Sequence, residues 1–361
     1  MPRLESRDIG IAFDMHGCPN ACRHCYLGRS HGPHLTERDV RWGCEQFRGY
    51  RRDGQTAPFF ETLKVYTWFR EPDYSDDYRR LHALSAELSD GEPMRFELLS
   101  VWRLARDPDY AAWAHQVSPD TCQISLFGLE DTNDWFYRRK GAFEDCLAAT
   151  KRLLEVGMKP RWQLFLTRKI LPELDGLMRL VDELRLPERV EALGDAFDLF
   201  LHPPGPDGEG RNIEHLRPTL EELGGVPEDL IASTKRHGKR DVLWRPERDW
   251  HAEILREQDP KPYSFVLPEG LTFYVKGDFD VYANIGPLEP PWRLGNLKSD
   301  GVATIIDAYE DNRPLAMRAM HTVAPSELAR RFGDPQSTRV YETADDLRLL
   351  YLYRYCDRLS A

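Results

Sequence analysis

Three cysteines stand close together near the start of the chain, at Cys18, Cys22 and Cys25. Their spacing is C-x3-C-x2-C, inside the sequence HGCPNACRHCY that covers residues 16–26. Three thiolates this close together can bind three irons of a [4Fe-4S] cluster and leave the fourth iron without a protein ligand. Such an open iron can bind a small molecule and pass an electron to it.

Two other uses of these cysteines must be weighed. With His16, His24 or His34 they could form a Cys3His zinc site, although zinc sites usually pair their cysteines as C-x2-C and no second pair follows downstream. Disulfides are disfavoured, because the chain has seven cysteines, an odd number, and no apolar leader segment. Iron–sulfur ligation is the favoured interpretation, and structural zinc remains the alternative.

The cysteine motif resembles the signature of the radical S-adenosylmethionine (radical SAM) superfamily. The resemblance implies one [4Fe-4S] cluster on Cys18, Cys22 and Cys25, with S-adenosylmethionine bound to the open iron through its amino and carboxylate groups. It further implies that an electron from the reduced cluster cleaves S-adenosylmethionine, and that the resulting 5′-deoxyadenosyl radical abstracts hydrogen from a substrate. A flavodoxin or ferredoxin is the electron donor that the family leads us to expect.

Two further stretches resemble the family's S-adenosylmethionine contacts. Glu71-Pro72 matches the end of a Gly-Gly-Glu-Pro-like run, which implies that the Glu71 carboxylate accepts hydrogen bonds from the amino group. Both glycines are replaced, by Phe69 and Arg70.

The second stretch matches the family's fourth-strand pattern and points to the carboxylate of S-adenosylmethionine. Ser125 and either Arg138 or Arg139 stand at the matching positions, and a guanidinium suits a carboxylate by its geometry and its fixed charge. The residue before the third cysteine commonly contacts the adenine in this family. Here that residue is His24, and Tyr26 is the alternative adenine neighbour.

Strand and helix patterns alternate through the first two thirds of the chain and must position these residues. We expect strands at 9–14, 63–69, 94–101, 122–127, 160–166 and 197–202, and helices at 36–50, 75–88, 108–116, 143–155 and 171–184. Alternation of this kind predicts parallel βαβ units of the α/β class, and the resemblance implies a partial (β/α)6 TIM-like barrel. The cysteines follow the first strand, at the end of the barrel where chemistry is located.

A Pro- and Gly-rich stretch at 202–210 predicts a boundary, after which the pattern changes. We expect a partial barrel at 1–212, a helical connector at 213–265 and a smaller α+β C-terminal domain at 266–361, with a hairpin at 271–274 and 280–282. Residues 277–284 and 294–297 resemble the SPASM/twitch extension of radical SAM maturases, with Ala283 at the position of a cluster cysteine. Because Cys356 is the only later cysteine, we expect a SPASM-like fold without an auxiliary cluster.

Cys356 has a separate hypothesis attached to it. Some radical SAM epimerases use a thiol to return a hydrogen atom to the substrate radical, and Cys356 is the candidate for such a donor in this chain. Epimerisation, dehydrogenation, decarboxylation and bond formation share the same first step, so the sequence leaves the reaction subtype open.

Bulk properties narrow the function classes. The net charge of −11 argues against a nucleic-acid partner, because phosphate recognition needs clustered Lys and Arg. No apolar run is long enough to span a membrane, and the polar N-terminal residues lead us to expect a cytoplasmic protein. Because the motif begins at residue 18, we expect no peptide-recognition domain ahead of it.

The leading hypothesis is a radical SAM enzyme that acts on a peptide or a small-molecule metabolite, in natural-product biosynthesis or peptide modification. The alternatives are an RNA-modifying radical SAM enzyme and a non-catalytic, metal-bearing binding protein.

Overall fold

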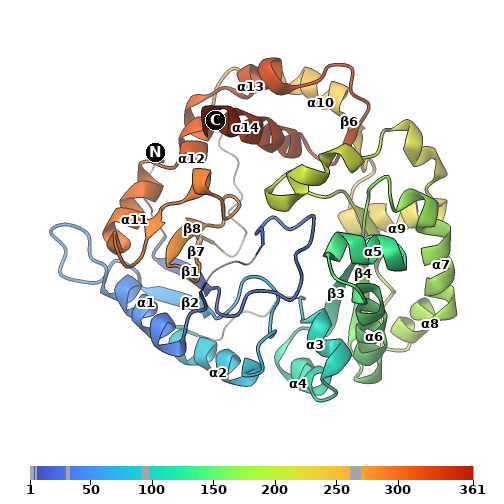
Figure 1. The fold of residues 1–361 in the computed structure, drawn as a ribbon, viewed down its shortest axis with the longest axis horizontal. Coiled ribbons are helices and arrows are strands. Elements are labelled where there is room, and N and C mark those ends of the chain that lie inside the picture. The colour runs from blue at the N-terminus through green and yellow to red at the C-terminus, as the bar shows by residue number, and fades with distance from the viewer. Residues whose placement is uncertain (1–3, 5, 30–32, 92–96, 261–269, 361) are drawn as a thin grey trace.

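Two sheets form the inner layer of the molecule, and helices cover their outer side (Figure 1). The computed structural model describes residues 4, 6–29, 33–91, 97–260 and 270–360. One sheet has the order β2-β1-β7-β8-β9, the second has the order β3-β4-β5, and β10 pairs with β6. The strands are β1 (Asp8–Phe13), β2 (Thr62–Tyr66), β3 (Thr121–Leu126), β4 (Lys159–Phe165), β5 (Leu199–His202), β6 (Arg245–Pro246), β7 (Thr272–Val275), β8 (Asp280–Ala283), β9 (Gly295–Asn296) and β10 (Val340–Tyr341).

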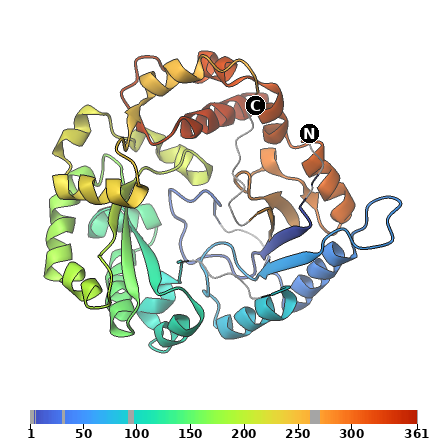
Figure 2. The same ribbon diagram turned by 180° about the vertical axis from the view of Figure 1, so that it is seen from behind.

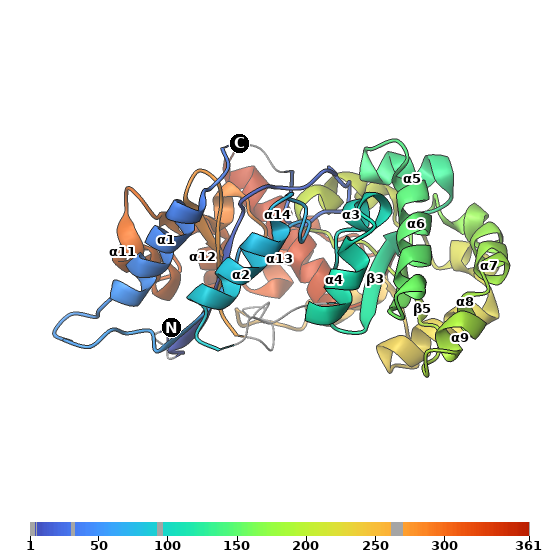
Figure 3. The ribbon, with the colours of Figure 1, turned by 90° about the horizontal axis from the view of Figure 1, so that it is seen from below.

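Most of the helices lie on the outer side of these sheets. α2 packs on β2, α6 packs on β3 and β4, and α9 packs on β5 (Figure 3). The α-helices are α1 (Glu37–Gly49), α2 (Tyr78–Leu88), α3 (Val101–Arg106), α4 (Tyr110–Val117), α5 (Glu130–Tyr137), α6 (Ala142–Glu155), α7 (Leu174–Glu183), α8 (Leu186–Glu191), α9 (Glu228–Gly238), α10 (Glu247–Ile254), α11 (Gly301–Glu310), α12 (Leu315–Thr322), α13 (Pro325–Phe332) and α14 (Ala344–Ser360). Short 3-10 helices are η1 (Leu171–Glu173), η2 (Gly208–Leu216), η3 (Glu221–Gly225) and η4 (Pro290–Trp292).

Local sequence signals explain where several elements begin. The Thr36 hydroxyl accepts a hydrogen bond from the Asp39 amide (3.3 Å), and the Asp39 carboxylate accepts one from the Thr36 amide (2.9 Å), so a capping box marks the start of α1. α2 differs from the expectation, because its N-cap is Asp77 and the Ser75 hydroxyl contacts the Asp77 carboxylate instead.

Parallel strands and the α/β class are confirmed, since β1 pairs in parallel with β2, and β3 pairs in parallel with β4 and β4 with β5. The expected third strand at 94–101 is wrong over its described part. Residues 94–96 lie outside the described residues, residues 97–100 form no strand, and α3 starts at Val101 because the Ser100 hydroxyl caps it (3.1 Å to the Arg103 amide). Within the described residues β1 and β2 lie in one sheet and β3, β4 and β5 in another, with β6 and β10 as a separate two-stranded pair, and a six-stranded barrel stays a prediction.

The C-terminal hairpin is part of the first sheet. β7 and β8 form the expected antiparallel hairpin, and β7 also pairs in parallel with β1 along the side opposite β2. The rings of Phe47 and Phe273 lie 5.5 Å apart within one apolar core, which joins residues 4–84 to residues 254–356. A second core lies around β3, β4 and β5. In Figure 2 the ribbon of these strands, in green, stands apart from that of β1 and β2, in blue. Each hydrophobic core thus gathers several elements, and the domain boundaries expected at 212 and 266 stay a prediction.

No helix among the described residues combines the length and the apolar character that crossing a membrane requires.

Candidate functional site

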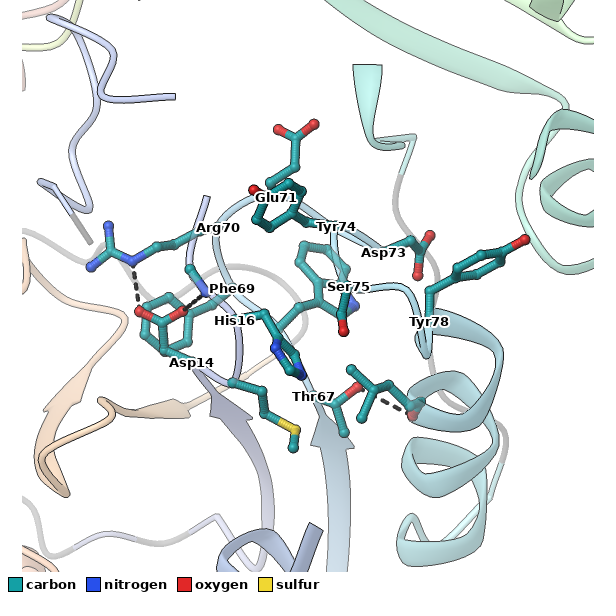
Figure 4. A pocket seen from close by; sticks show the side chains of 14 residues that line it. Asp14, His16, Thr67, Phe69, Arg70, Glu71, Asp73, Tyr74, Ser75 and Tyr78 are labelled. Atoms are coloured by element: carbon teal, nitrogen blue, oxygen red, sulfur yellow. Dashed lines mark hydrogen bonds and ion pairs between the residues drawn. The ribbon is translucent and has the colours of Figure 1, made fainter. Parts of the chain in front are cut away.

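The three cysteines lie on a loop of residues 14–28 that leaves the carboxyl end of β1, and Arg70 closes the base of this cysteine loop. The Arg70 guanidinium forms an ion pair with Asp14 (2.7 Å) and donates a hydrogen bond to the Gly28 carbonyl. The side chains of Arg70 and Asp14 are 4% and 10% exposed, so this pair is shielded from water. Arg70 stands where the family pattern has a glycine, and its side chain points toward Asp14, away from the Glu71 carboxyl (Figure 4).

A second contact comes from residues 205–211, which we call the glycine clamp. The Glu209 amide donates to the Cys25 carbonyl (3.0 Å), and the Glu209 carboxylate pairs with Arg138 (2.8 Å) and Arg29 (3.4 Å). Gly208 has a φ of +51°, and a Cβ atom there would lie 2.5 Å from the Cys25 carbonyl oxygen. The sequence suggested only a domain boundary at this stretch, and the structure places it directly against the third cysteine.

The end of α5 holds the other side of the cysteine loop. Arg139 donates to the Asn20 side chain (2.6 Å) and pairs with Asp145 (2.6 Å). Arg138 follows α5 with a left-handed φ of 53°. Both arginines thus bind protein groups at the loop, and neither belongs to the described residues that line the cavity beside the cysteines.

That cavity has a volume of about 370 Å³, and all three cysteines line it. Burial raises the pKa of the three thiols, and for Cys18 the negative charge of Glu71 raises it further. A cysteine binds a metal as its thiolate, so binding of a cluster by these three thiols has to release protons. His24, Tyr26, Glu71 and Ser125, which the sequence singled out, line the same cavity.

Glu71 brings a carboxyl group to the wall of this cavity, so it is a candidate to bind a positively charged group of a cofactor. Its side chain accepts hydrogen bonds from the Ser100 hydroxyl (2.9 Å) and from the Trp102 amide (3.4 Å). Burial raises the pKa of Glu71 to about 7. A positively charged ligand in the cavity would favour the ionised carboxylate.

The raised pKa predicts a measurable dependence of stability on pH. Between about pH 4.5 and pH 7 the folded protein keeps a proton on Glu71 that the unfolded chain releases, so this contribution to folding stability is lost as the pH rises. In the protein without cluster and S-adenosylmethionine, the free energy of unfolding is expected to fall by at most roughly 3 kcal/mol as the pH rises through this range. The Glu71→Gln variant should not show this fall. Urea denaturation at pH 5 and pH 8 measures it, with Glu45→Gln on the exposed face of α1 as the control. Identical pH slopes for wild type and Glu71→Gln would contradict the prediction.

The two proposed adenine neighbours have different surroundings. The His24 ring lies 4.5 Å from the Phe127 ring and 4.4 Å from the Phe165 ring, and burial lowers its pKa to about 3, so it is neutral. Tyr26 is 47% exposed and hydrogen-bonds to Tyr274.

Ser125 lies on β3, where its hydroxyl donates to the Gln163 side chain (3.3 Å). The hydroxyl therefore has a protein partner on the neighbouring strand, at the wall of the cavity.

The three histidines near the cysteines have other neighbours among the described residues. His16 lies 3.7 Å from Asp77 and its ring stacks on His34 at 5.9 Å, while His24 is enclosed by phenylalanines. Across the described ranges, no three His, Cys, Asp or Glu side chains are arranged to hold a single metal ion. A [4Fe-4S] cluster instead spreads its ligands over separate irons, and three thiols on one loop at a cavity wall fit that requirement.

Several cavity residues were not singled out from the sequence. Inward-facing positions alternate along the first sheet, with small residues at Gly10 and Ala12 of β1 and larger ones at Lys64 and Tyr66 of β2. The period-two pattern of β1 and β2 could have identified them. The β7 residues Thr272 and Tyr274 could not be found this way, because their pairing with β1 joins distant parts of the chain.

Cys356 lies elsewhere. It is 1% exposed on α14, inside the apolar core, and burial raises its pKa to about 12. It is not one of the described residues that line the cavity of the three cysteines. Its role as a hydrogen donor stays a prediction.

The sequence matches no protein-family model and no curated protein. The structure of anSMEcpe with bound S-adenosylmethionine (AdoMet) is similar over 97% of both chains, with a TM-score of 0.52 and 10% identity. The structure of anSMEcpe with AdoMet and the Cp18Cys peptide gives 0.52 and 11%, again over 97% of both chains. Streptococcus suis SuiB bound to its precursor peptide SuiA reaches 0.43 at 13% identity, over 86% of this chain and 65% of SuiB. The described structure therefore shares its fold with anSMEcpe over nearly the whole of both chains.

Proposed function

We propose that this chain is a radical SAM enzyme that abstracts hydrogen from a peptide or small-metabolite substrate. The observation that carries the proposal is that Cys18, Cys22, Cys25 and Glu71 border one cavity, in a fold shared with AdoMet-bound anSMEcpe. When bound, a reduced [4Fe-4S] cluster supplies the electron that cleaves AdoMet and yields the 5′-deoxyadenosyl radical.

The chain's own residues would bind and orient the two cofactors. The three thiolates hold the cluster, and the Glu71 carboxylate receives the AdoMet ammonium group, which keeps it ionised. Ser125, with Arg138 or Arg139, binds the AdoMet carboxylate once the arginines exchange their present protein partners. His24 and Tyr26 border the adenine, and the neutral His24 ring offers an apolar face.

A peptide is the favoured substrate class, in natural-product or peptide-modification biosynthesis. The support comes from anSMEcpe, which is similar to this chain over nearly the whole length of both proteins. One of its structures holds the Cp18Cys peptide together with AdoMet. A flavodoxin- or ferredoxin-type protein is the proposed electron donor.

The test is formation of 5′-deoxyadenosine from AdoMet by anaerobically reconstituted protein with dithionite. We expect product from the iron-loaded protein and none without dithionite. A separate AdoMet titration of the iron-loaded protein guards against slow cleavage in the absence of substrate. A protein with full iron content that neither binds AdoMet nor forms 5′-deoxyadenosine would overturn the proposal.

A further inference from the structure

A second cavity, of about 190 Å³, adjoins the cavity of the cysteines. Tyr26 and Tyr274 line both cavities, and Asp207, Asn284 and Tyr353 line the second. We call this second cavity the tyrosine chamber. Tyr26 directly follows the cysteine Cys25, so a molecule in the chamber would lie beside the proposed cofactor site. The chamber is therefore the natural place to look for the group by which a substrate is held.

Asp207 is the only acidic or basic residue among the described residues that line the chamber. No Lys, Arg or His of the described chain forms an ion pair with it. The neighbouring cation, Arg211, is already bound by Glu289 through two contacts (2.8 and 2.9 Å) and by Asp357 (3.3 Å). The chamber thus contains a carboxyl group that lacks a counterion.

The charges around Asp207 are mostly negative. Burial, together with the carboxylates of Asp346 and Glu289, raises the pKa of Asp207 to about 6, against the lowering effect of Arg211. An incoming cation would relieve both effects, since it stabilises the ionised form of a buried carboxyl. An anionic ligand would meet repulsion at the same place.

Tyr353 gives an independent sign of a missing partner. The residue is 2% exposed, and its hydroxyl oxygen has no hydrogen-bond partner in the described part of the protein. Buried polar atoms without partners are rare in native proteins because each costs about 1–3 kcal/mol. Tyr353 lines the chamber, and the negative charge of Asp207 acts on its hydroxyl. A ligand bound to Asp207 would therefore lie close to the Tyr353 hydroxyl.

The rings of Tyr26 and Tyr274 and one carboxylate form a composition suited to a cation. The Tyr353 ring already has the Arg211 guanidinium 4.9 Å from its centre. The negative faces of aromatic rings attract ammonium and guanidinium groups, and aromatic cages for such ligands use this attraction. We propose that the tyrosine chamber binds a cationic group of the substrate, an amine or a guanidinium, with Asp207 as its counterion. This assignment rests on the proposed function. It makes the chamber a specificity site, because a substrate whose cationic group is bound there would present a neighbouring carbon to the cofactor cavity.

Binding of small probes to the reconstituted protein with AdoMet tests the proposal without any turnover. Calorimetry would compare Nα-acetyl-lysine N-methylamide with its uncharged counterpart, Nα-acetyl-norleucine N-methylamide. We expect the lysine derivative to bind at least tenfold more tightly to the wild type, and Asp207→Asn to remove this preference. Cadaverine and agmatine separate the sources of the cation: tighter binding of these free amines than of the lysine derivative would indicate a small metabolite, and the reverse a peptide side chain.

Controls keep the result interpretable. Asp229→Asn removes an exposed carboxylate on α9 and matches the change in net charge, so it should keep the preference. Tyr353→Phe preserves the shape of the chamber and should weaken binding of the lysine derivative even if Asp207→Asn folds poorly. Equal binding of the two derivatives, no saturable binding of any cation, or a preference that survives Asp207→Asn would overturn the proposal. Loss of 5′-deoxyadenosine formation alone would count against the proposed function and leave the binding result intact.

Discussion

Replacing Cys18, Cys22 or Cys25 with Ala, one at a time, is expected to abolish formation of 5′-deoxyadenosine. Each variant removes one of the three thiolate ligands, so a second iron of the cluster would lose its protein ligand. The other four cysteines are buried. The iron content should fall from about four atoms per chain toward background. Iron and sulfide analysis, absorbance near 400 nm and product formation measure the effect together.

Cys44→Ala is the matched control for this experiment. Cys44 is 1% exposed on α1, in the apolar core, so its loss should lower stability while iron content and product formation remain. A Cys22→Ala protein that kept its iron and its 5′-deoxyadenosine formation would show that the loop does not bind the cluster. Zinc in place of iron in the wild type, lost in the same variants, would point to a structural metal site.

Gly208→Ala is expected to strip the protein of most of its iron, although Gly208 is not a ligand. Its added Cβ would lie 2.5 Å from the Cys25 carbonyl oxygen and 2.6 Å from the Tyr26 carbonyl oxygen. Both are backbone atoms, so the clash has to move the cysteine loop or the glycine clamp. The hydrogen bond from the Glu209 amide to the Cys25 carbonyl would then be lost as well.

Gly194→Ala separates this clash from ordinary backbone strain. Gly194 also has a positive φ, +87°, and a Cβ there would have nothing within 4 Å. Both variants carry the left-handed strain of about 1–2 kcal/mol, and only Gly208→Ala carries the clash. Parallel iron analysis after identical reconstitution is the measurement. Equal iron contents in the two variants would contradict a positioning role for the clamp.

Much of the parallel architecture could be predicted from the sequence, because its signals are local. Thr36 and Asp39 stand three residues apart, and alternating apolar residues mark strands such as β3 within a single window. The cysteine motif is equally local, so the loop that follows β1 was identified directly. Glu71 could be identified because the run Glu71-Pro72 resembles the family's pattern, and in the structure it stands five residues after β2.

The remaining features depend on contacts between distant residues, which no window contains. The pairing of Gly10 with Thr272 spans most of the chain, and so does the single core that joins the two ends. The glycine clamp resembles a linker in composition, because Pro and Gly mark both flexible boundaries and tight backbone approaches. The ion pair of Arg70 could not be predicted for the same reason, because its buried partner Asp14 lies 56 residues earlier in the sequence.

The position of β7 beside β1 has a consequence for synthesis of the protein. On the ribosome, the cysteine loop emerges early. β1 cannot pair with β7, its second neighbouring strand, until residues 272–275 have been translated. Until that moment one edge of β1 has unpaired backbone groups, so the nascent chain presents a surface on which other chains can assemble. Delivery of iron and sulfide to a finished site must therefore be largely a post-translational event, and a fragment ending near residue 212 would be prone to aggregation.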